Sequence, residues 1–236
     1  MRVFSVSDLH MPGGKDKPMD VFGRNWEGHM KKIRKDWKEK VTPDDVVLIA
    51  GDISWAMTLD EALGDLRTLS DLPGKKVFIR GNHDYWWNGI TALRKAAPDD
   101  SYIFLQNDCV RIGRAVICGS RGWLCPGSAE FTPDDEKIYR REAQRFLLCF
   151  SQVRKIREEG DLLIVMQHYP PFNGKGEPSL FTELFETNAA DIVVFGHVHG
   201  QRGRYSLDEN RNGIRYLLTA CDQLDFRVKF LTEIGS

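Results

Sequence analysis

The chain has 236 residues, 42% of them hydrophobic and 28% charged, and a formal net charge of −1. This is an ordinary globular balance, and the near-zero charge argues against nucleic acid or an anionic membrane surface as a partner. The five cysteines are odd in number and form no C-x-x-C pair, which argues against a disulfide framework and a thiolate zinc site and fits a reducing compartment.

The chain begins with a predicted strand, Val3–Ser7, and no apolar signal segment follows it. The longest aliphatic runs, such as Val46–Ala50 and Leu162–Met166, are far too short to cross a membrane. We therefore expect one cytoplasmic domain over residues 1–236 with no membrane span. The sequence leaves the oligomeric state open.

Short aliphatic runs alternate with amphipathic stretches along the chain, which is typical of α/β proteins. After Val3–Ser7, strands are predicted in chain order at Val46–Ala50, Lys76–Ile79, Tyr102–Leu105, Ala115–Cys118, Leu162–Met166, Ile192–Phe195, Gly203–Leu207, Ile214–Thr219 and Arg227–Ile234. Several of these are continuous β-branched runs, as expected for strands covered on both faces.

Three helices are indicated by apolar spacing or by their first residues. The first runs from Trp26 to Trp37, with apolar residues three and four positions apart, and His29 is interpreted as a surface residue within it. The second begins with a capping box at Thr58–Glu61, and the third begins at Thr132, which is followed by proline and two acids.

Five of the six histidines directly follow a predicted strand, in short turns that contain glycine or aspartate. In α/β folds ligands bind at the carboxyl ends of strands, so these turns are expected to meet. In chain order the motifs are Asp8-Leu9-His10, Gly51-Asp52, Gly81-Asn82-His83-Asp84, His168-Tyr169-Pro170 and Gly196-His197-Val198-His199.

In order, spacing and strand-end placement, these five blocks resemble the calcineurin-like metallophosphoesterase family, in particular its stand-alone bacterial-type phosphohydrolases. Each block alone is a weak signal, but five in order are improbable by chance, and they cover most of the chain, from Asp8 to His199. The resemblance implies an α/β fold: a four-layer α/β/β/α sandwich of two mixed β-sheets flanked by helices.

The resemblance also implies a site for two divalent metal ions. In this family pattern one ion is held by Asp8, His10 and His199, the other by Asn82, His168 and His197, and both by Asp52. Carboxylate, imidazole and amide donors suit Mn²⁺, with Fe or Zn²⁺ as alternatives. An amide at position 82 leaves the two ions, two carboxylates and a bridging hydroxide with a net charge of roughly +1, which attracts a phosphate ester.

By the same resemblance, His83 approaches the leaving-group oxygen as general acid or electrostatic stabiliser, and Asp84 orients it. The alternative for this pair is a purely structural hydrogen bond. The implied reaction is hydrolysis of a phosphate monoester or diester, with a hydroxide that bridges the ions attacking phosphorus in line.

Substrate contacts are sought among residues close to the motifs, and the expected partner is a small phosphorylated substrate. Trp55, Trp86, Trp87 and Trp123 could wall a pocket for an aromatic or apolar leaving group, although core packing is the alternative for each. Arg121 is a candidate phosphate contact. Arg80 could reach a phosphate or form a partly buried salt bridge.

Two other classes of function stay open. One is a non-catalytic metal-binding interaction scaffold, and the other is a protein phosphatase or nuclease of the same family. The scaffold is disfavoured because every expected ligand position and His83 are present. Neither a basic channel nor a peptide groove is apparent in the sequence.

Overall fold

The computed structural model describes residues 1–14, 19–200 and 205–235. Its strands form a five-stranded sheet in the order β11-β1-β2-β3-β4 and a six-stranded sheet in the order β5-β6-β7-β8-β10-β9. The strands of the first sheet are β1 (Arg2–Ser5), β2 (Val46–Ile49), β3 (Lys75–Phe78), β4 (Tyr102–Phe104) and β11 (Lys229–Glu233). Those of the second are β5 (Asp108–Ile112), β6 (Ala115–Ser120), β7 (Leu162–Gln167), β8 (Ile192–Phe195), β9 (Asp208–Arg211) and β10 (Ile214–Leu218).

Both sheets are mixed. Strands β1 to β4 run parallel, and β11 adds an antiparallel edge to the first sheet. In the second sheet β6, β7, β8 and β10 run parallel, with β5 and β9 as antiparallel edges. The central strands β2 and β8 are buried at every residue, which is why their sequences are continuous aliphatic and aromatic runs.

The helices lie on the outer faces of the two sheets. They are α1 (His29–Lys40), α2 (Leu59–Arg67), α3 (Ile90–Lys95), α4 (Pro133–Ile156) and α5 (Leu180–Thr187). Reciprocal capping boxes fix the starts of α2 at Thr58, α4 at Thr132 and α5 at Ser179. Within the described residues, no helix is both long and apolar enough to span a bilayer.

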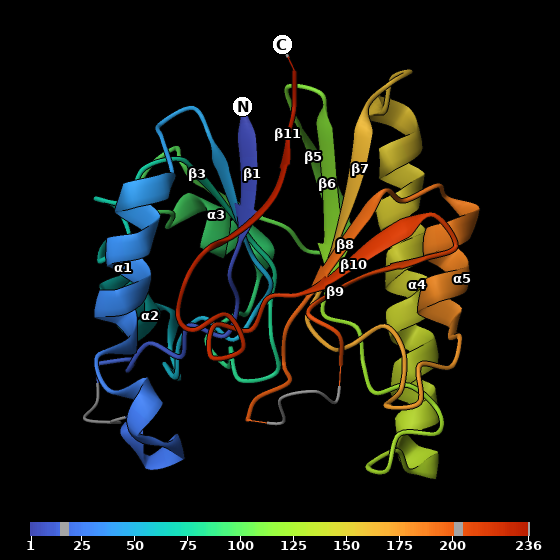
Figure 1. Cartoon of the computed structure of the whole chain (residues 1–236), viewed down its shortest axis with the longest axis horizontal. Helices are drawn as coiled ribbons and strands as arrows, with labels where there is room; N and C mark the ends of the chain where they lie inside the picture. Colours follow the sequence, from blue (N-terminus) through green and yellow to red (C-terminus); the bar gives the residue numbers. More distant parts are fainter. Residues whose placement is uncertain (15–18, 201–204, 236) are drawn as a thin grey trace.

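Figure 1 shows four layers, with α1 and α2 against the first sheet and α4 and α5 against the second. The architecture is therefore the expected α/β/β/α sandwich. The parallel strands run toward the lower edge in this view, where the loops that follow them gather, and both termini lie at the opposite edge. The carboxyl ends of both sheets are thus brought to one place.

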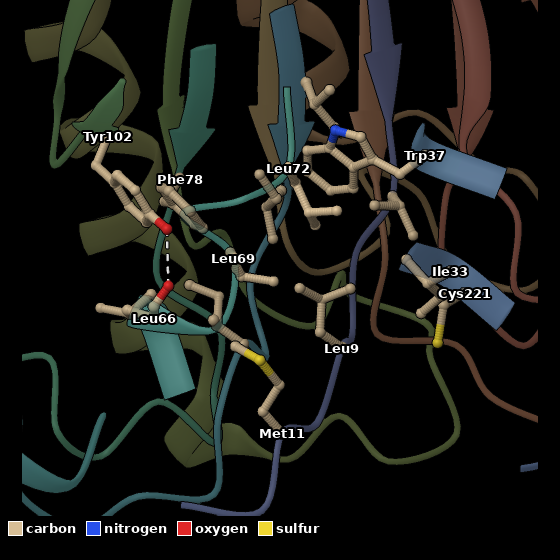
Figure 2. Close-up of a cluster of buried hydrophobic side chains, with 14 of the residues drawn as sticks. Leu9, Met11, Ile33, Trp37, Leu66, Leu69, Leu72, Phe78, Tyr102 and Cys221 are labelled. Carbon is tan, nitrogen blue, oxygen red and sulfur yellow. Dashed lines mark hydrogen bonds between the residues drawn. The ribbon is translucent and has the colours of Figure 1, made fainter. Parts of the chain in front are cut away.

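Three apolar clusters hold the layers together. One lies between the sheets and includes Val46, Val77, Ile164 and Val194. The other two join each sheet to its helices. Figure 2 shows part of the cluster under α1 and α2, where Trp37 packs beside Leu72 and the Tyr102 hydroxyl donates a hydrogen bond to the Leu66 carbonyl oxygen at 2.7 Å.

The structure differs from the sequence prediction in several elements. Helix α1 begins at His29, and Trp26 belongs to a preceding 3₁₀ turn, Arg24–Trp26. Strand β5 and the helices α3 and α5 were not predicted. The expected strand Gly203–Leu207 begins outside the described residues, and the described strand there is β9, which starts at Asp208.

Candidate metal centre

The seven predicted ligands follow the carboxyl ends of β2, β3, β7 and β8 and of the single bridge, Ser7 to Ala220, that continues β1. Four are contributed by the first sheet and three follow β7 and β8 of the second. We call this group the candidate ligand cluster: Asp8, His10, Asp52, Asn82, His168, His197 and His199. The fold therefore gathers residues separated by up to 191 positions into one site, but whether they hold metal stays a prediction.

Several cluster residues have a left-handed backbone. The φ angle is 59° at Asp8, 52° at Asp52 and 70° at His197. Aspartate and histidine enter this region more readily than most residues, but the conformation still costs energy. The strain is offset by hydrogen bonds between the turns, such as Asp8 N to Gly51 O at 2.9 Å and His197 N to Asp8 Oδ1 at 3.1 Å.

Two glycines are required by close approach to the carboxylates. A Cβ at Gly81 would lie 2.1 Å from Asp52 Oδ1, and a Cβ at Gly196 would lie 2.2 Å from Asp8 Oδ2. Any side chain at either position would displace an acid of the cluster. These glycines of the sequence motifs are therefore explained by packing against the site.

The first predicted group is compact. His199 Nε2 lies 3.2 Å from both Asp8 Oδ1 and His10 Nε2. The other ring nitrogen of His199 is 2.9 Å from Asp222 Oδ1, which fixes the ring orientation. Asp8, His10 and His199 are one of two described groups whose potential ligand atoms all lie within 4.8 Å of one another.

The second predicted group is equally compact. Asn82 Oδ1 lies 2.7 Å from His168 Nε2 and 2.9 Å from His197 Nδ1. The Nδ1 atom of His168 is 2.9 Å from the carbonyl oxygen of Ala50, an arrangement that leaves Nε2 free to act as a ligand. The second described acid–histidine group is Asp8, Asp52 and His168.

Asp52 lies between the two groups. Its Oδ2 atom is 3.5 Å from His168 Nε2 and 3.9 Å from His10 Nε2, and its Oδ1 atom accepts the backbone N–H of His83 at 2.8 Å. The separations of 2.7–3.9 Å across the cluster suit ligands shared by ions at roughly 2.1 Å, since adjacent ligands on one ion are then about 3.0–3.4 Å apart. The donor set and its spacing therefore fit divalent metal ions.

The electrostatics of the cluster divide its imidazoles into two kinds. Burial alone would lower every histidine pKa, but the negative charges of Asp52 and Asp8 raise the pKa of His168 to about 9. Asp8 and Asp222 similarly overcome burial and raise the pKa of His199 to about 10. Burial prevails at the other two and lowers the pKa of His10 to about 4 and that of His197 to about 3.

His83 lies beside the cluster. Its Nε2 atom is 4.0 Å from Asp52 Oδ2, its ring contacts Trp55 with centroids 4.5 Å apart, and 35% of its side chain is exposed. Burial lowers its pKa. The ring therefore faces the site without being drawn into either ligand group.

The family resemblance implies that Asp84 orients the His83 ring, but no hydrogen bond joins their side chains in the described part of the chain. Its two oxygens accept the backbone N–H groups of Ile53, Ser54 and Gly81 and the indole N–H of Trp86. Within the described residues, His83 Nδ1 has no hydrogen-bond partner. Asp84 is wholly buried and holds the turns after β2 and β3 together, so it positions the loop that carries His83.

The predicted substrate contacts fall into different environments. Trp86 and Trp87 are fully buried, and Trp86 is hydrogen-bonded to Asp84, so both are core residues and the pocket prediction is wrong for them. Trp123 is half-buried, 5.0 Å from the Tyr169 ring, and its indole donates to Asp135. Trp55 stacks on His10 with centroids 4.9 Å apart.

Two cavities flank the cluster. One, of about 260 Å³, is lined by His10, His83, Trp26, Trp55, Met19, His199 and Gly200. The other, of about 480 Å³, is lined on one side by His197 and His199 and otherwise by largely apolar residues such as Tyr169 and Phe172. Trp55 thus lines a cavity at the site, whereas the Arg121 side chain faces Glu142 and a third, smaller cavity.

Sequence reasoning missed three residues around the site. Trp26 packs on His10, His29 and His199, and His29, interpreted as a surface residue, is half-buried with Nε2 2.9 Å from the Leu9 carbonyl oxygen. Asp222 orients His199 from the turn after β10. Only Asp222 carried a sequence signal, because it is an acid shortly after a predicted strand.

The family model and curated relatives that match this chain both indicate metallophosphoesterases. The family model for calcineurin-like phosphoesterases matches residues 1–201. An uncharacterized metallophosphoesterase of Helicobacter pylori is 25% identical over 188 residues, which are 74% of this chain and 43% of that protein. The gene 66 protein of Mycobacterium phage L5 is 39% identical over 81 residues, 34% of this chain and 38% of that protein. The chain therefore spans about two fifths of the length of these curated relatives.

Solved structures with the same fold are distant in sequence. A protein of unknown function from Aquifex aeolicus superposes with a TM-score of 0.52 at 17% identity, covering 97% of this chain and 95% of the other. The phosphopantetheinyl hydrolase of Mycobacterium tuberculosis superposes with a TM-score of 0.54 at 15% identity, covering 99% and 96%. At these identities the likeness concerns the fold alone.

Proposed function

The chain belongs to the calcineurin-like phosphoesterase family, and on that basis we propose that it hydrolyses a phosphate monoester or diester at the candidate ligand cluster. In this proposal Asp8, His10 and His199 hold one divalent ion, and Asn82, His168 and His197 hold the other. Asp52 is shared by both. Bound there, the ions would supply Lewis-acid stabilisation of the phosphoryl charge and lower the pKa of water.

The observation that carries the proposal is the position of Asp52 Oδ2. This atom lies within 3.5–4.0 Å of imidazole nitrogens from both ligand groups and of His83. Asp8 is also close to both groups, but its oxygens already accept from Ser7 Oγ at 2.5 Å and from the His197 backbone. Asp52 is therefore the better candidate for the shared carboxylate.

His83 is the candidate for assisting the leaving group. Because burial lowers its pKa, the ring is neutral near pH 7 and carries one N–H donor. Its Nε2 faces the cluster while part of the ring borders the cavity of about 260 Å³. An ester oxygen placed there could accept a hydrogen bond from this N–H, which would stabilise the negative charge that develops as the phosphorus–oxygen bond breaks. Trp55, on the same wall, would contact the leaving group.

The donor set favours Mn²⁺, with Fe or Zn²⁺ as alternatives, because no thiolate faces the site among the described residues. Cys221 is close, but its Sγ is directed at the Asp8 carbonyl oxygen, 3.1 Å away. All five cysteines are free thiols, four of them buried, which supports a reducing compartment such as the cytoplasm. We propose that residues 1–236 act as one domain on a small phosphorylated substrate.

Metal content and hydrolysis test the assignment together. Wild type, Asp52→Asn and Asp8→Asn are dialysed against Mn²⁺, analysed for metal per chain, and assayed on monoester and diester panels. We expect about two ions in wild type, loss at both positions in Asp52→Asn and loss at one in Asp8→Asn. The reverse pattern would assign the shared role to Asp8. A wild-type protein without metal or hydrolysis would instead favour an interaction scaffold.

A further inference from the structure

A small cavity beside the cluster is lined by three arginines that the proposed reaction does not use. We call it the arginine pocket: Arg80, Gln106, Asn107, Ser120, Arg121 and Arg145 line it, and its volume is about 70 Å³. That is about twice the ~30 Å³ share of one water molecule, so the pocket suits a compact polar group.

The pocket lies next to the ligand cluster along the strand ends. Arg80 is two residues before Asn82. The carbonyl oxygen of Arg121 accepts the backbone N–H of His168 at 3.0 Å, and the strands that precede them, β6 and β7, are adjacent. Neighbouring strands are about 4.8 Å apart, so we expect one or two strand spacings, roughly 5–10 Å, between the pocket and the cluster.

The charge of the pocket is only partly compensated. Glu142, which is fully buried, lies 2.6 Å from Arg145 Nη1 and 3.3 Å from Arg121 Nη2. Arg80 makes no hydrogen bond or ion pair among the residues that the structure describes, and its buried Nε atom has no partner. Three guanidinium groups against one carboxylate leave a formal charge of +2 around a small cavity.

The neutral groups in the pocket are arranged as donors. Gln106 uses its side-chain oxygen to accept from the Trp87 indole at 2.8 Å, and Asn107 uses its own to accept from Ser120 Oγ at 3.1 Å. Each amide therefore keeps its NH₂ group for another partner. The Nε atom of Arg121 is also buried without a partner in the described chain. The surplus of positive charge and of hydrogen-bond donors together indicates that the ligand of this pocket is an oxyanion.

We propose that the arginine pocket binds a second phosphate group of the substrate. The inference rests on hydrolysis at the ligand cluster, and it specifies the substrate class: a phosphoester whose second phosphate lies roughly 5–10 Å from the scissile one. Guanidinium groups bind phosphate oxygens through charge-assisted hydrogen bonds, which are about twice as strong as neutral ones. The second phosphate would thus orient the ester over the metal site.

A matched pair of esters tests the class. Phosphate release by the Mn²⁺-loaded protein is measured on butane-1,4-diol bisphosphate and on butyl phosphate. We expect wild type to favour the bisphosphate by at least about tenfold in kcat/KM, and Arg80→Gln to reduce that preference about tenfold. Equal kcat/KM on the two esters, or an unchanged preference in Arg80→Gln, would overturn the proposal.

Arg80 is the informative position because, in the part of the chain that the structure describes, it has no ion-pair partner that its replacement would leave unpaired in the core. Arg80→Lys keeps the charge and should retain part of the preference. Arg140→Gln is the matched control: it removes the same charge from the exposed side of α4, where Arg140 pairs with Glu136. This variant should keep the wild-type preference for the bisphosphate. If its preference falls as far as that of Arg80→Gln, the preference depends on the overall charge of the protein and not on the arginine pocket, and the proposal is overturned.

A binding measurement separates this proposal from the proposed function. Sulfate has the shape of phosphate and cannot be hydrolysed, so its affinity is measured by calorimetry in wild type and Arg80→Gln. We expect about a tenfold loss in the variant. If neither ester is hydrolysed but this loss is seen, the pocket stands and the proposed reaction fails. If the affinity is unchanged, the pocket is refuted whatever the activity.

Discussion

Under the proposed function, the protonation of individual histidines determines how the candidate ligand cluster takes up metal. Asp52, Asp8 and Asp222 raise the pKa of His168 to about 9 and that of His199 to about 10 against the effect of burial. In the metal-free protein both rings are therefore protonated at pH 7.5. A histidine must lose this proton before it can bind a metal ion.

We accordingly predict that metal binding releases about two protons per chain at pH 7.5. Because the folded pKa values lie above this pH, metal affinity should rise as the pH is raised from 7 toward 10. Calorimetry of Mn²⁺ binding in buffers of different ionisation enthalpy gives the number of protons directly. Binding without proton release at pH 7.5 would contradict the electrostatic assignment of His168 and His199.

His83 should contribute to the reaction and not to metal binding. His83→Ala should keep the wild-type metal content and lose about 10²–10³-fold in kcat, the usual cost of removing one donor that stabilises developing charge. The loss should be smaller for p-nitrophenyl esters, whose leaving-group oxygen needs little stabilisation. Elemental analysis provides the control. An equal loss on good and poor leaving groups would assign His83 a positioning role.

Two tryptophans near the site should respond differently to truncation. Trp86 is fully buried, so Trp86→Ala should lower the free energy of unfolding by roughly 3–5 kcal/mol. Trp55 lines the cavity beside His10 and His83, so Trp55→Ala should mainly raise KM. Thermal melting and kinetics on both variants check this. If Trp55→Ala lowers the Tm more than Trp86→Ala does and leaves KM unchanged, Trp55 is a core residue and not a substrate contact.

The elements with strong local signals were predicted well. The capping boxes at Thr58 and Thr132 mark the starts of α2 and α4, and the aliphatic runs mark β2, β7 and β8. Strand β5 carries polar and half-exposed residues, and α3 is only six residues long. Both are formed by pairing or packing against neighbouring elements, so no periodicity in their own residues could indicate them.

Asp45 lies directly before β2 and forms hydrogen bonds with Arg2 of β1 and with Thr42, in the loop after α1. Its contribution to the free energy of unfolding should therefore be visible in the pH dependence of stability. Burial alone would raise the pKa of Asp45, but hydrogen bonds from Arg2 and Thr42 outweigh it and lower the pKa to about 2, from the ordinary 3.8. The carboxylate therefore stabilises the fold above pH 3.8, and the stabilisation is lost as the pH falls toward 2.

Asp45→Asn should lower the free energy of unfolding by about 2 kcal/mol at pH 7 and flatten its fall between pH 4 and pH 2. Urea denaturation across this range measures both effects. Asp44→Asn, at the exposed neighbouring residue, is the control and should change little. If Asp45→Asn keeps the wild-type acid dependence, the hydrogen bonds to Arg2 and Thr42 do not lower the pKa as described.

Across the whole molecule, the strand-end rule predicted which residues would meet but not how each is supported. The motif blocks gather because parallel strands of both sheets end at one edge. The partners of Asp84, the ring of Trp26 over His10, and the approach of Arg80 to Arg121 depend on contacts between turns far apart in sequence. A single sequence does not reveal which of these turns come close together in the folded chain, so these contacts could not be predicted.

The ligand cluster spans the interface between the two sheets, so metal should stabilise the whole fold. Asp8 and Asp52 follow strands of the first sheet, and His168 and His197 follow strands of the second. A ligand that binds only the folded state adds about 2.7 kcal/mol at a concentration of 100 Kd. For a chain of this size that corresponds to an increase of roughly 5–11 °C in Tm.

Chelator-treated protein should therefore melt at a lower temperature and regain stability as Mn²⁺ is added. Asp52→Asn should lose most of this dependence, because the proposed function assigns that carboxylate to both ions. A Tm independent of Mn²⁺ in wild type, or equally dependent in Asp52→Asn, would show that metal does not link the sheets through Asp52.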